Sequence, residues 1–408
     1  MFAAPAPADR ELMIQAVRLA ARIDRRPWPN PPVGAIVARD GEVIGRGAHQ
    51  GPGTAHAEVL ALREAGSRAR GATLYCTLEP CNHQGRTPPC VPAVLASGVA
   101  RVVVAVRDPN PTVAGGGLER LLDGGIAVTL GVCADDAIEL IWPFVVTGAF
   151  VRPFVCLKTA TSLDGRFAPA ARRERAPVYV TSELARHEVH VLRRWSDVVL
   201  VGGETMRADA PRLDTRMVTS EDACPACDPI PAVATSGEPG DEWTGRRHVV
   251  FTNRRSLNPI PASSPEKSGQ ALRVVECDEC EGGIDPASIL EQLAGLDAFT
   301  LLVEGGPRLA ASFLEAGVVD RWVSYTAPVV LGSGPRWPDF AIGKEAVPDS
   351  ISSPRPEIES GTVSFTLTRV ARCGPDLKAV WDRVPFAATR DRLTDGSASQ
   401  VPASGGGA

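Results

Sequence analysis

Apolar side chains in the first third of the chain repeat with two periods, one helical and one strand-like. Helical spacing covers 9–23, where Asp9 is the expected N-cap, and alternation covers 33–49 around the Asp40-Gly41 pair, which predicts a hairpin turn. Further along, the pattern predicts helices at 56–66, 88–97 and 118–125 and strands at 72–78, 101–106 and 126–131. This order predicts an α/β sandwich around one sheet.

A second α/β pattern begins near Phe150. Predicted strands occupy 154–160, 178–182, 197–203, 248–253, 272–277, 299–306 and 322–331, and predicted helices occupy 183–195, 286–295 and 307–317. The Pro-, Gly- and Ser-rich stretches at 217–245 and 254–270 are expected to be loops. We therefore expect two domains, 1–147 and 148–380, and a disordered tail at 381–408.

Composition narrows the class of protein. The 408 residues carry a net charge of −5 with acids and bases mixed, which argues against a nucleic-acid or membrane partner. The chain has no run of about 18 apolar residues and no signal-peptide pattern at its start, so we expect a cytoplasmic protein. Its ten cysteines are then best interpreted as metal ligands or buried thiols.

The most specific chemical signal is a zinc-ligand pattern. His56 is followed two residues later by Glu58, and Cys81 and Cys90 follow further along. One imidazole and two thiolates leave a fourth zinc position for a water, which the metal activates as a nucleophile. Glu58 can carry the proton from that water to a ring nitrogen and to leaving ammonia, as in zinc deaminases. The eight residues between the cysteines are expected to form part of a substrate wall.

The same residues allow a structural interpretation. A closed zinc site needs a fourth protein ligand, for which His83 is the nearest candidate. Unrelated buried cysteines are the other alternative. The His-x-Glu pair and the Pro-Cys step favour the catalytic site, because all of them agree with one chemistry.

Eight longer motifs stand out between residues 8 and 378. They are NPPVGAIV (30–37), HAE (56–58), TLEPCNHQGRTPPC (77–90), RDPNP (107–111), LKTATSLDGR (157–166), VTS (180–182), ADAPRLDTR (208–216) and VEGGPRLAASFLEAGVVD (303–320). These motifs resemble those of the bifunctional riboflavin-biosynthesis deaminase/reductase family. The resemblance implies a cytidine-deaminase-like α/β/α sandwich followed by a dihydrofolate-reductase-like α/β domain.

The resemblance also implies the chemistry. The substrate would be 2,5-diamino-6-(5-phosphoribosylamino)pyrimidin-4-one, a small phosphorylated pyrimidine. The first domain would use Zn²⁺ to hydrolyse its 2-amino group, and the second would use NADPH to reduce the ribosyl group to ribityl. A homo-oligomer is implied as well, and the long apolar segment 322–331 could pair across a dimer.

Site residues follow from the match to the family motifs. In the deaminase, zinc falls on His56, Cys81 and Cys90, proton transfer on Glu58, and substrate contacts on Asn30, His49, His83, Asp108 and Asn110. Each of these substrate contacts also has a structural interpretation. Asn30 could be a turn residue, His49 and His83 could be polar loop residues, and Asp108 with Asn110 could form a capped turn. In the reductase, the strand–Gly-Gly–helix step at 303–307 can hold a cofactor phosphate on backbone N–H groups.

The match places two further sets of residues in the reductase. The set near NADPH is Ala160, Tyr179, Thr181, Thr205, Asp209, Gly306, Pro307, Arg308, Leu309, Ala310, Ala311 and Ser312. The set near the substrate is Arg193, Leu213, Arg216 and Glu304. Arginine suits the ribose phosphate because a guanidinium binds it through two hydrogen bonds. The alternative for Arg193 and Arg216 is a solvated surface charge.

Several positions depart from the family pattern. Tyr179 stands where the family usually has Trp, Ala210 where it has Asp or Asn, and Asp214 where it has Thr. The segment 171–177 is also longer and more basic than usual. Asp214 adds a negative charge where phosphate is expected, which supports an alternative with a non-catalytic second domain. Two Cys-x-x-Cys pairs, Cys224/Cys227 and Cys277/Cys280, have the ligand count of a second, structural zinc site or are unrelated thiols.

A last alternative is a nucleobase or tRNA deaminase fused to an unrelated α/β domain. A tRNA-binding version should carry basic stripes, which the negative net charge does not favour.

Overall fold

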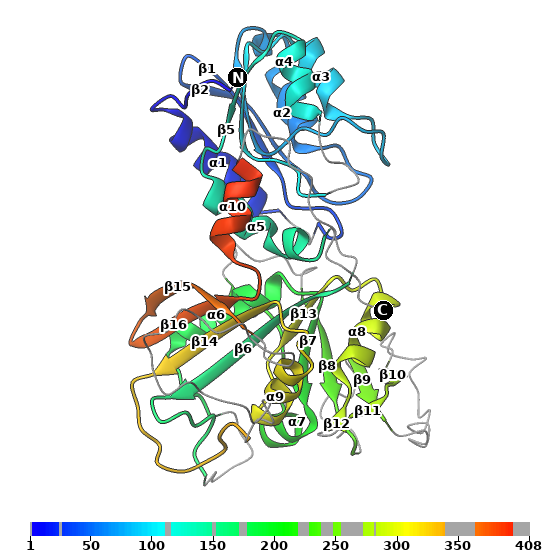
Figure 1. Ribbon diagram of the computed structural model, residues 1–408, viewed down its shortest axis with the longest axis vertical. Coiled ribbons are helices and arrows are strands. Elements are labelled where there is room, and N and C mark those ends of the chain that lie inside the picture. Colours follow the sequence, from blue (N-terminus) through cyan, green and yellow to red (C-terminus); the bar gives the residue numbers. More distant parts are fainter. Residues whose placement is uncertain are drawn as a thin grey trace, which may run out of the picture. The chain divides into compact units, whose positions relative to one another are not determined.

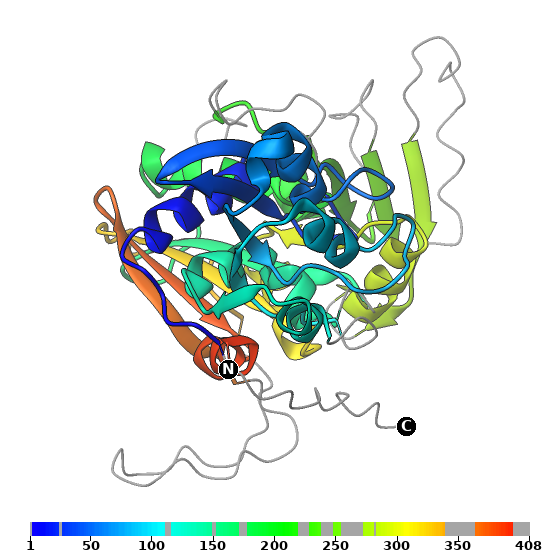
Figure 2. The ribbon, with the colours of Figure 1, turned by 90° about the horizontal axis from the view of Figure 1, so that it is seen from above.

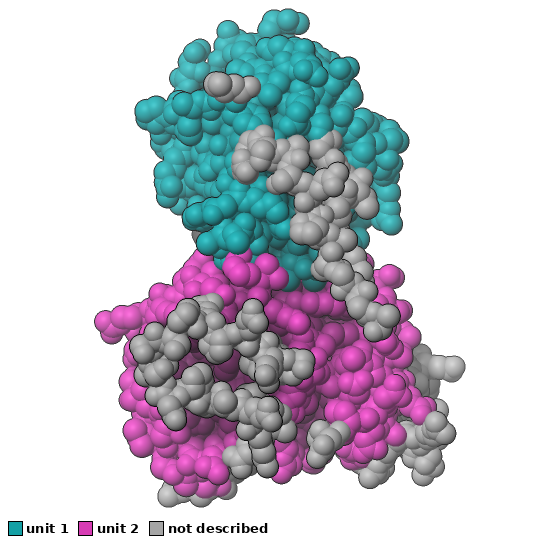
Figure 3. All heavy atoms as spheres, viewed as in Figure 1, with its two compact units in different colours: residues 1–151, 386–408 teal, residues 152–385 magenta. Residues whose placement is uncertain are grey.

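The computed structural model describes residues 2–23, 27–110, 116–148, 152–170, 178–218, 228–237, 248–253, 272–280, 283–338 and 364–394. The chain forms two compact units, Met1–Val151 with Phe386–Ala408, and Arg152–Pro385 (Figure 3). The expected boundary between 147 and 148 therefore falls inside unit 1. No helix in the described part of the chain is long and apolar enough to cross a bilayer.

Unit 1 is built on a five-stranded sheet in the order β2-β1-β3-β4-β5 (Figure 1). Its strands are β1 (Gly34–Arg39), β2 (Glu42–Ala48), β3 (Thr73–Leu78), β4 (Arg101–Val106) and β5 (Ala127–Leu130). Its helices are α1 (Asp9–Ala21), α2 (Ala57–Ala65), α3 (Cys90–Ser97), α4 (Gly117–Asp123), α5 (Ala134–Val146) and α10 (Phe386–Thr394), with a 3₁₀ turn at Gly66–Ala69. β3, β4 and β5 are parallel, and the β1–β2 hairpin is antiparallel.

The predicted elements of unit 1 form for the expected reasons. Asp40 and Gly41 both have positive φ, 52° and 82°, as a tight hairpin turn requires. Asp9 is the first residue of α1 and not its N-cap. Its buried carboxylate instead accepts hydrogen bonds from Tyr75 at 3.0 Å and from Arg101 at 2.7 Å, so it ties the helix to the sheet.

Helix α2 lies unusually close to strand β2 because Gly47 has no side chain. A Cβ at Gly47 would overlap the backbone carbonyl oxygen of Ala57, at the start of α2. We expect Gly47→Ala to lower the free energy of unfolding of unit 1 by about 3 kcal/mol, because backbone has to move to relieve the overlap. Denaturant unfolding measures this. Gly85→Ala is the control, since its Cβ would meet only the His83 side chain at 3.5 Å. Equal stability of the two variants would contradict the close packing.

Two helices of unit 1 were not predicted from sequence. α5 contains Pro143, and α10 comes from the far end of the chain and lies beside α5 (Figure 2). The Phe386 ring lies 5.1 Å from that of Trp142, and the Leu393 carbonyl accepts a hydrogen bond from the Arg107 backbone. The prediction of a disordered tail is therefore wrong for 381–394, whereas 395–408 lies outside the described residues.

Unit 2 is built on a nine-stranded sheet in the order β10-β9-β8-β7-β13-β6-β14-β16-β15. The strands are β6 (Phe154–Ser162), β7 (Val198–Gly202), β8 (Ile230–Ala234), β9 (His248–Thr252), β10 (Leu272–Glu276), β13 (Thr300–Val303), β14 (Arg321–Ala327), β15 (Thr366–Cys373) and β16 (Asp376–Asp382). The helices are α6 (Glu183–Arg194), α7 (Gly203–Asp209), α8 (Pro286–Ala294) and α9 (Pro307–Glu315), and β11 (Glu279–Cys280) pairs with β12 (Gly283–Ile284). Only the β14–β16–β15 edge of the large sheet is antiparallel.

Three sequence predictions in unit 2 are wrong. Residues 178–182 are not a strand; Val178 and Tyr179 are exposed, and Ser182 caps α6 by accepting a hydrogen bond from Ala185. The expected loop at 217–245 contains β8. The segment 322–331 is neither the last strand nor that long, because β14 ends at Ala327 and the β15–β16 hairpin follows.

Candidate functional sites

Three side chains of unit 1 converge in the geometry of a metal site. His56 is the N-cap of α2, Cys90 is the first residue of α3, and Cys81 follows the carboxyl end of β3. The His56 Nδ1 atom lies 3.1 Å from Cys90 Sγ and 3.4 Å from Cys81 Sγ. Among the described residues, these three form the one group of His, Cys, Asp and Glu whose ligand atoms all lie within 4.8 Å of one another.

The local sequence explains this convergence. The Pro89 φ of −61° leads directly into α3, and the backbone N–H of Cys90 donates to both the carbonyl oxygen and the sulfur of Cys81. The residues between the cysteines therefore form a closed loop. Thr87, from that loop, lies 3.0 Å from His56 Nε2 and orients the ring. His83 is exposed and outside the group, which does not support a closed site with His83 as fourth ligand.

The electrostatics of the three side chains fit a bound cation. Hydrogen bonding from Cys90 lowers the pKa of the Cys81 thiol to about 4, and the His56 hydrogen bond adds to the effect. The same contact raises the pKa of Cys90, since the two sulfurs compete for one proton. A divalent cation removes this competition by binding both as thiolates. One imidazole and two thiolates at two helix N-termini are thus a donor set suited to zinc.

Glu58 lies beside this group and is only 3% exposed. Burial raises the pKa of its carboxyl, and the nearby Cys81 thiolate adds to that effect. It is the second residue of α2, so the same helix start positions both Glu58 and His56. A buried carboxyl with a raised pKa is suited to taking up and releasing a proton.

Other predicted deaminase residues lie around the same centre. Asn30 Nδ2 lies 2.9 Å from His49 Nε2, and the His49 ring lies 5.2 Å from the His56 ring. Burial, together with the charges of Glu79, Cys81 and Glu58, raises the pKa of Asp108 to about 7. The Asn110 backbone donates to Asp108 Oδ1 at 2.9 Å, which is the capped-turn arrangement.

Glu79 was not singled out from the sequence. It is 6% exposed and accepts hydrogen bonds from the backbones of Asp108 and Leu118. It therefore fixes the Asp108 loop and the start of α4 against β3. The sequence shows that Glu79 stands between strand β3 and the Pro-Cys step. Its hydrogen-bond partners are far along the chain, so the sequence does not show what it binds.

Unit 2 contains two adjoining cavities, of about 950 and 230 Å³, at the carboxyl ends of β7 and β13. They share Glu204, Thr205 and the 306–308 segment at the start of α9. The predicted residues that line one or both are Ala160, Tyr179, Thr181, Arg193, Thr205, Asp209, Leu213, Arg216, Glu304, Gly306, Pro307, Arg308, Leu309 and Ser312. Ala310 and Ala311 are buried in the packed face of α9 and line neither cavity.

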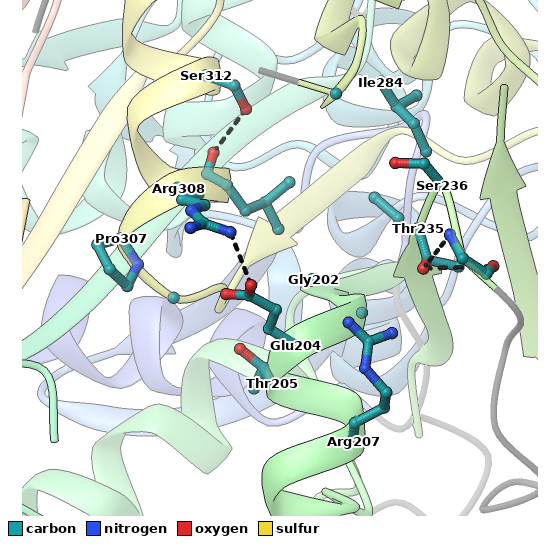
Figure 4. A pocket seen from close by; sticks show the side chains of 16 residues that line it. Gly202, Glu204, Thr205, Arg207, Thr235, Ser236, Ile284, Pro307, Arg308 and Ser312 are labelled. Atoms are coloured by element: carbon teal, nitrogen blue, oxygen red, sulfur yellow. Dashed lines mark hydrogen bonds and ion pairs between the residues drawn. The ribbon is translucent and has the colours of Figure 1, made fainter. Parts of the chain in front are cut away.

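The smaller cavity has the features of a phosphate cradle. Figure 4 shows Thr205 on α7 on the side of the start of α9, Arg207 on α7 extending toward Thr235, and Arg308 bonded to Glu204. A Cβ at Gly306 would lie 3.5 Å from Thr205 Oγ1, so the glycine leaves room there. The backbone N–H groups of the first turn of α9 can bind an anion, which fits the phosphates of NADPH.

A buried ion-pair cluster occupies the larger cavity. Arg193 binds both carboxylate oxygens of Glu304, at 2.6 and 2.9 Å, and Lys158 Nζ lies 3.5 Å away. Burial alone would raise the pKa of Glu304, but the charges of Arg193 and Lys158 outweigh it and lower that pKa to about 2. Sequence reasoning missed Lys158, although it lies in the 157–166 motif. Arg193 is not a solvated surface charge.

The three residues that depart from the family pattern, Tyr179, Ala210 and Asp214, all line or adjoin this cavity and fit their surroundings. Asp214 is 5% exposed and forms ion pairs with both Arg212 and Arg216, so its charge is compensated. Tyr179 stacks under the Arg186 guanidinium at 4.3 Å. Ala210 adopts a left-handed conformation with φ of 41° at the end of α7. The objection that Asp214 would repel a phosphate is thereby weakened.

The proposed second zinc site is only partly described. Cys224 and Cys227 lie outside the described residues. Cys277 is 5% exposed and packs in the hydrophobic core of unit 2, and burial raises its pKa to about 11. A buried thiol in apolar surroundings agrees better with the alternative that these cysteines are unrelated thiols.

Comparisons with known proteins match both units. The model of the cytidine and deoxycytidylate deaminase zinc-binding region matches residues 7–106, and that of the RibD C-terminal domain matches 153–378. Riboflavin biosynthesis protein RibD from Aquifex aeolicus is 37% identical over 352 residues, which cover 86% of this chain and 95% of the relative. The Escherichia coli protein of the same name is 37% identical over 387 residues, covering 90% and 98%.

Solved structures extend the match to the whole fold. Acinetobacter baumannii RibD, form 1, has a TM-score of 0.69 and 31% identity, and covers 92% of this chain and 98% of its own. The diaminohydroxyphosphoribosylaminopyrimidine deaminase/5-amino-6-(5-phosphoribosylamino)uracil reductase from Thermotoga maritima has a TM-score of 0.70 and 30% identity with the same coverage. An unrelated second domain is therefore excluded. The chain belongs to the family of bifunctional riboflavin-biosynthesis proteins, with a zinc-dependent deaminase domain followed by an NADPH-dependent reductase domain.

Proposed function

We propose that unit 1 deaminates 2,5-diamino-6-(5-phosphoribosylamino)pyrimidin-4-one and that unit 2 then reduces the ribosyl group of the product, each with the residues described above. The observation that carries the proposal is the convergence of His56, Cys81 and Cys90 beside the buried carboxyl of Glu58. A small phosphorylated pyrimidine fits both units, since one holds a proton-transfer group beside a metal site and the other a basic cavity.

In unit 1, His56 and the two cysteines would hold zinc, which supplies Lewis-acid activation of a water. The water oxygen forms a bond to ring carbon 2, and the bond from that carbon to the amino nitrogen breaks. The Glu58 carboxylate takes one proton from the water and delivers it to the ring nitrogen. It then takes the second proton from the new hydroxyl on that carbon and delivers it to the amino group, which leaves as ammonia, and so ends in its starting state. Asn30, His49, Asp108 and, from the cysteine loop, His83 orient the ring, with Asn110 holding the Asp108 turn.

In unit 2, NADPH would supply a hydride to the ribosyl carbon attached to nitrogen, while the bond from that carbon to the sugar ring oxygen breaks and that oxygen takes up a proton. The smaller cavity and the first turn of α9 hold the cofactor phosphates, with Thr205, Arg308 and Ser312 at its wall. Lys158 and Glu304 face the reacting end of the substrate in the larger cavity. Arg216 and Arg193, with Leu213 also in the wall, hold the phosphate-bearing sugar.

Loss of one sulfur tests the metal assignment. We expect Cys81→Ser to lower the zinc content from roughly one ion per chain to a small fraction, because a neutral hydroxyl is a poor ligand. Ammonia release from the diaminopyrimidine should disappear with the metal, whereas NADPH oxidation with pre-deaminated product should persist. Elemental analysis and the two assays measure this. Full zinc content in the variant would contradict the assignment, and Cys76→Ser in the core is the matched control.

A homo-oligomer and a cytoplasmic location belong to the same proposal. The segment once expected to pair across a dimer is β14, which is hydrogen-bonded to β6 on one side and to β16 on the other. It therefore has no free edge. An oligomer would have to use another surface, and sedimentation analysis of the purified protein tests whether one forms.

A further inference from the structure

One face of helix α6 is turned toward the larger cavity of unit 2. Arg186, Val189, His190 and Arg193 line it, and their spacing of three and four residues places them on one side of the helix. Arg186 is stacked on Tyr179, and Arg193 is bound to Glu304. His190 has no such partner in the part of the chain that the structure describes.

The His190 side chain is buried yet lacks a hydrogen-bond partner. It is 4% exposed, and its Nδ1 atom has no partner among the described residues. Nδ1 is enclosed by protein atoms, whereas Nε2 is accessible and also lacks a hydrogen-bond partner among the described residues. Because the ring lies in the wall of the cavity, a molecule bound in that cavity is placed to contact Nε2 and to satisfy it.

The charges around the cavity indicate the kind of molecule. Its wall has seven Lys or Arg side chains and three acidic ones, namely Lys158, Arg186, Arg193, Arg212, Arg216, Arg308 and Arg336 against Glu204, Asp209 and Glu304. Asp214, behind the wall, pairs with Arg212 and Arg216, and the cations still outnumber the acidic groups, seven to four. Such an excess attracts an anion. Burial lowers the pKa of His190 to about 4, and Arg193 and Arg216 lower it further than Asp214 and Glu304 raise it. The imidazole is therefore neutral in the free protein and lies in a positive field.

We propose that His190 is a positioning residue that binds the phosphate monoester of the sugar-phosphate substrate, together with Arg216. The inference rests on the proposed function and adds a residue to it. A phosphate dianion offers acceptor oxygens to an imidazole N–H and to a guanidinium at once. It would also offset the field of the arginines and so favour a proton on the ring. The phosphate would thus give Nε2 its partner.

Spectroscopy of the full-length protein tests the contact without turnover. The chain has six histidines, and His190→Asn assigns the imidazole signal of His190. At pH 6 we expect ribose 5-phosphate to move that signal toward the imidazolium position, because a nearby anion raises the pKa of a histidine by about one to three. Ribose without phosphate should leave it unchanged. Equal responses to the two sugars, or no response to either, would overturn the proposal.

Kinetics test the same contact in the reaction. We expect His190→Ala to raise the KM of NADPH-dependent reduction about tenfold with a smaller change in kcat, the effect of losing one hydrogen bond to a charged group. His190→Gln places an amide nitrogen near Nε2 and should recover most of the loss. His187→Ala, one turn away and in neither cavity wall, is the matched control. Unchanged ammonia release shows that each variant is folded in unit 1, and unit 2 is checked by its unfolding transition.

Two failures are distinguishable. If His190→Ala and His187→Ala have the same KM while the wild-type chain turns over, the role of His190 is overturned and the proposed function stands. If the wild-type chain does not oxidise NADPH, the proposed function of unit 2 fails, and the response of the imidazole to ribose 5-phosphate still decides whether His190 binds phosphate.

Discussion

Replacing Glu58 with Gln is expected to reduce ammonia release by about three orders of magnitude while zinc stays bound. General acid–base catalysis contributes about 10²–10⁴ in rate, and Glu58 is assigned every proton transfer of this reaction. Gln keeps the shape of the side chain and cannot exchange a proton. It should also fit the buried position at 3% exposure without the cost of burying a charge.

The measurement is ammonia release from the diaminopyrimidine, with zinc content determined on the same sample. Glu64→Gln is the matched control, because Glu64 is an exposed residue of the same helix and bonds only the Arg46 backbone at 2.9 Å. That variant should retain near wild-type rates. Ammonia release by Glu58→Gln within a factor of ten of wild type would remove Glu58 from the mechanism.

Replacing Glu304 with Ala is expected to be the most damaging change in unit 2. Arg193 would keep its charge in a site where it is only 11% exposed, without the carboxylate that now binds it twice. Breaking a buried pair by removing one partner costs about 3–5 kcal/mol. We expect the free energy of unfolding of unit 2 to fall by that amount and NADPH oxidation to fall by about 10² or more, since Lys158 also loses its partner.

Denaturant unfolding and NADPH oxidation measure these effects. Glu204→Ala is the control for stability, because Glu204 pairs with Arg308 where the two side chains are 70% and 76% exposed. Removing such a surface pair should change stability by about 0–1 kcal/mol. Ammonia release should be unaffected in both variants. A Glu304→Ala protein as stable as Glu204→Ala would show that the buried cluster contributes little.

The same carboxylate predicts a pH dependence. Its pKa in the folded protein is about 2, below the ordinary value of 4.5. The stabilisation is therefore fully present above about pH 4.5 and is lost as the pH falls toward 2. The difference in stability between wild type and Glu304→Ala should shrink over that interval. A difference that is constant from pH 7 to pH 3 would mean that the ion pair is not its source.

Sequence reasoning was reliable where structure depends on near neighbours. The order of elements from α1 to β5 follows from local periodicity, and the Asp40-Gly41 turn needs only backbone conformations that those residues favour. The metal group was also predictable, since His56 and Cys90 start helices and Cys81 follows a buried strand. Each of these placements depends on a short stretch of chain.

Tertiary structure decided what depends on residues far apart in sequence. The residues 386–394 look like a polar tail, yet they form α10, because Phe386 packs on Trp142 and Leu393 bonds to Arg107. The interpretation of Asp214 also depends on the tertiary structure, because two arginines form ion pairs with it and compensate its negative charge. Lys158 and His190 line one cavity only because β6, α6 and the 304–308 segment lie next to one another in the fold. These contacts between distant segments determine the pairing partners of the side chains, their burial and their pKa values. No local sequence pattern contains that information.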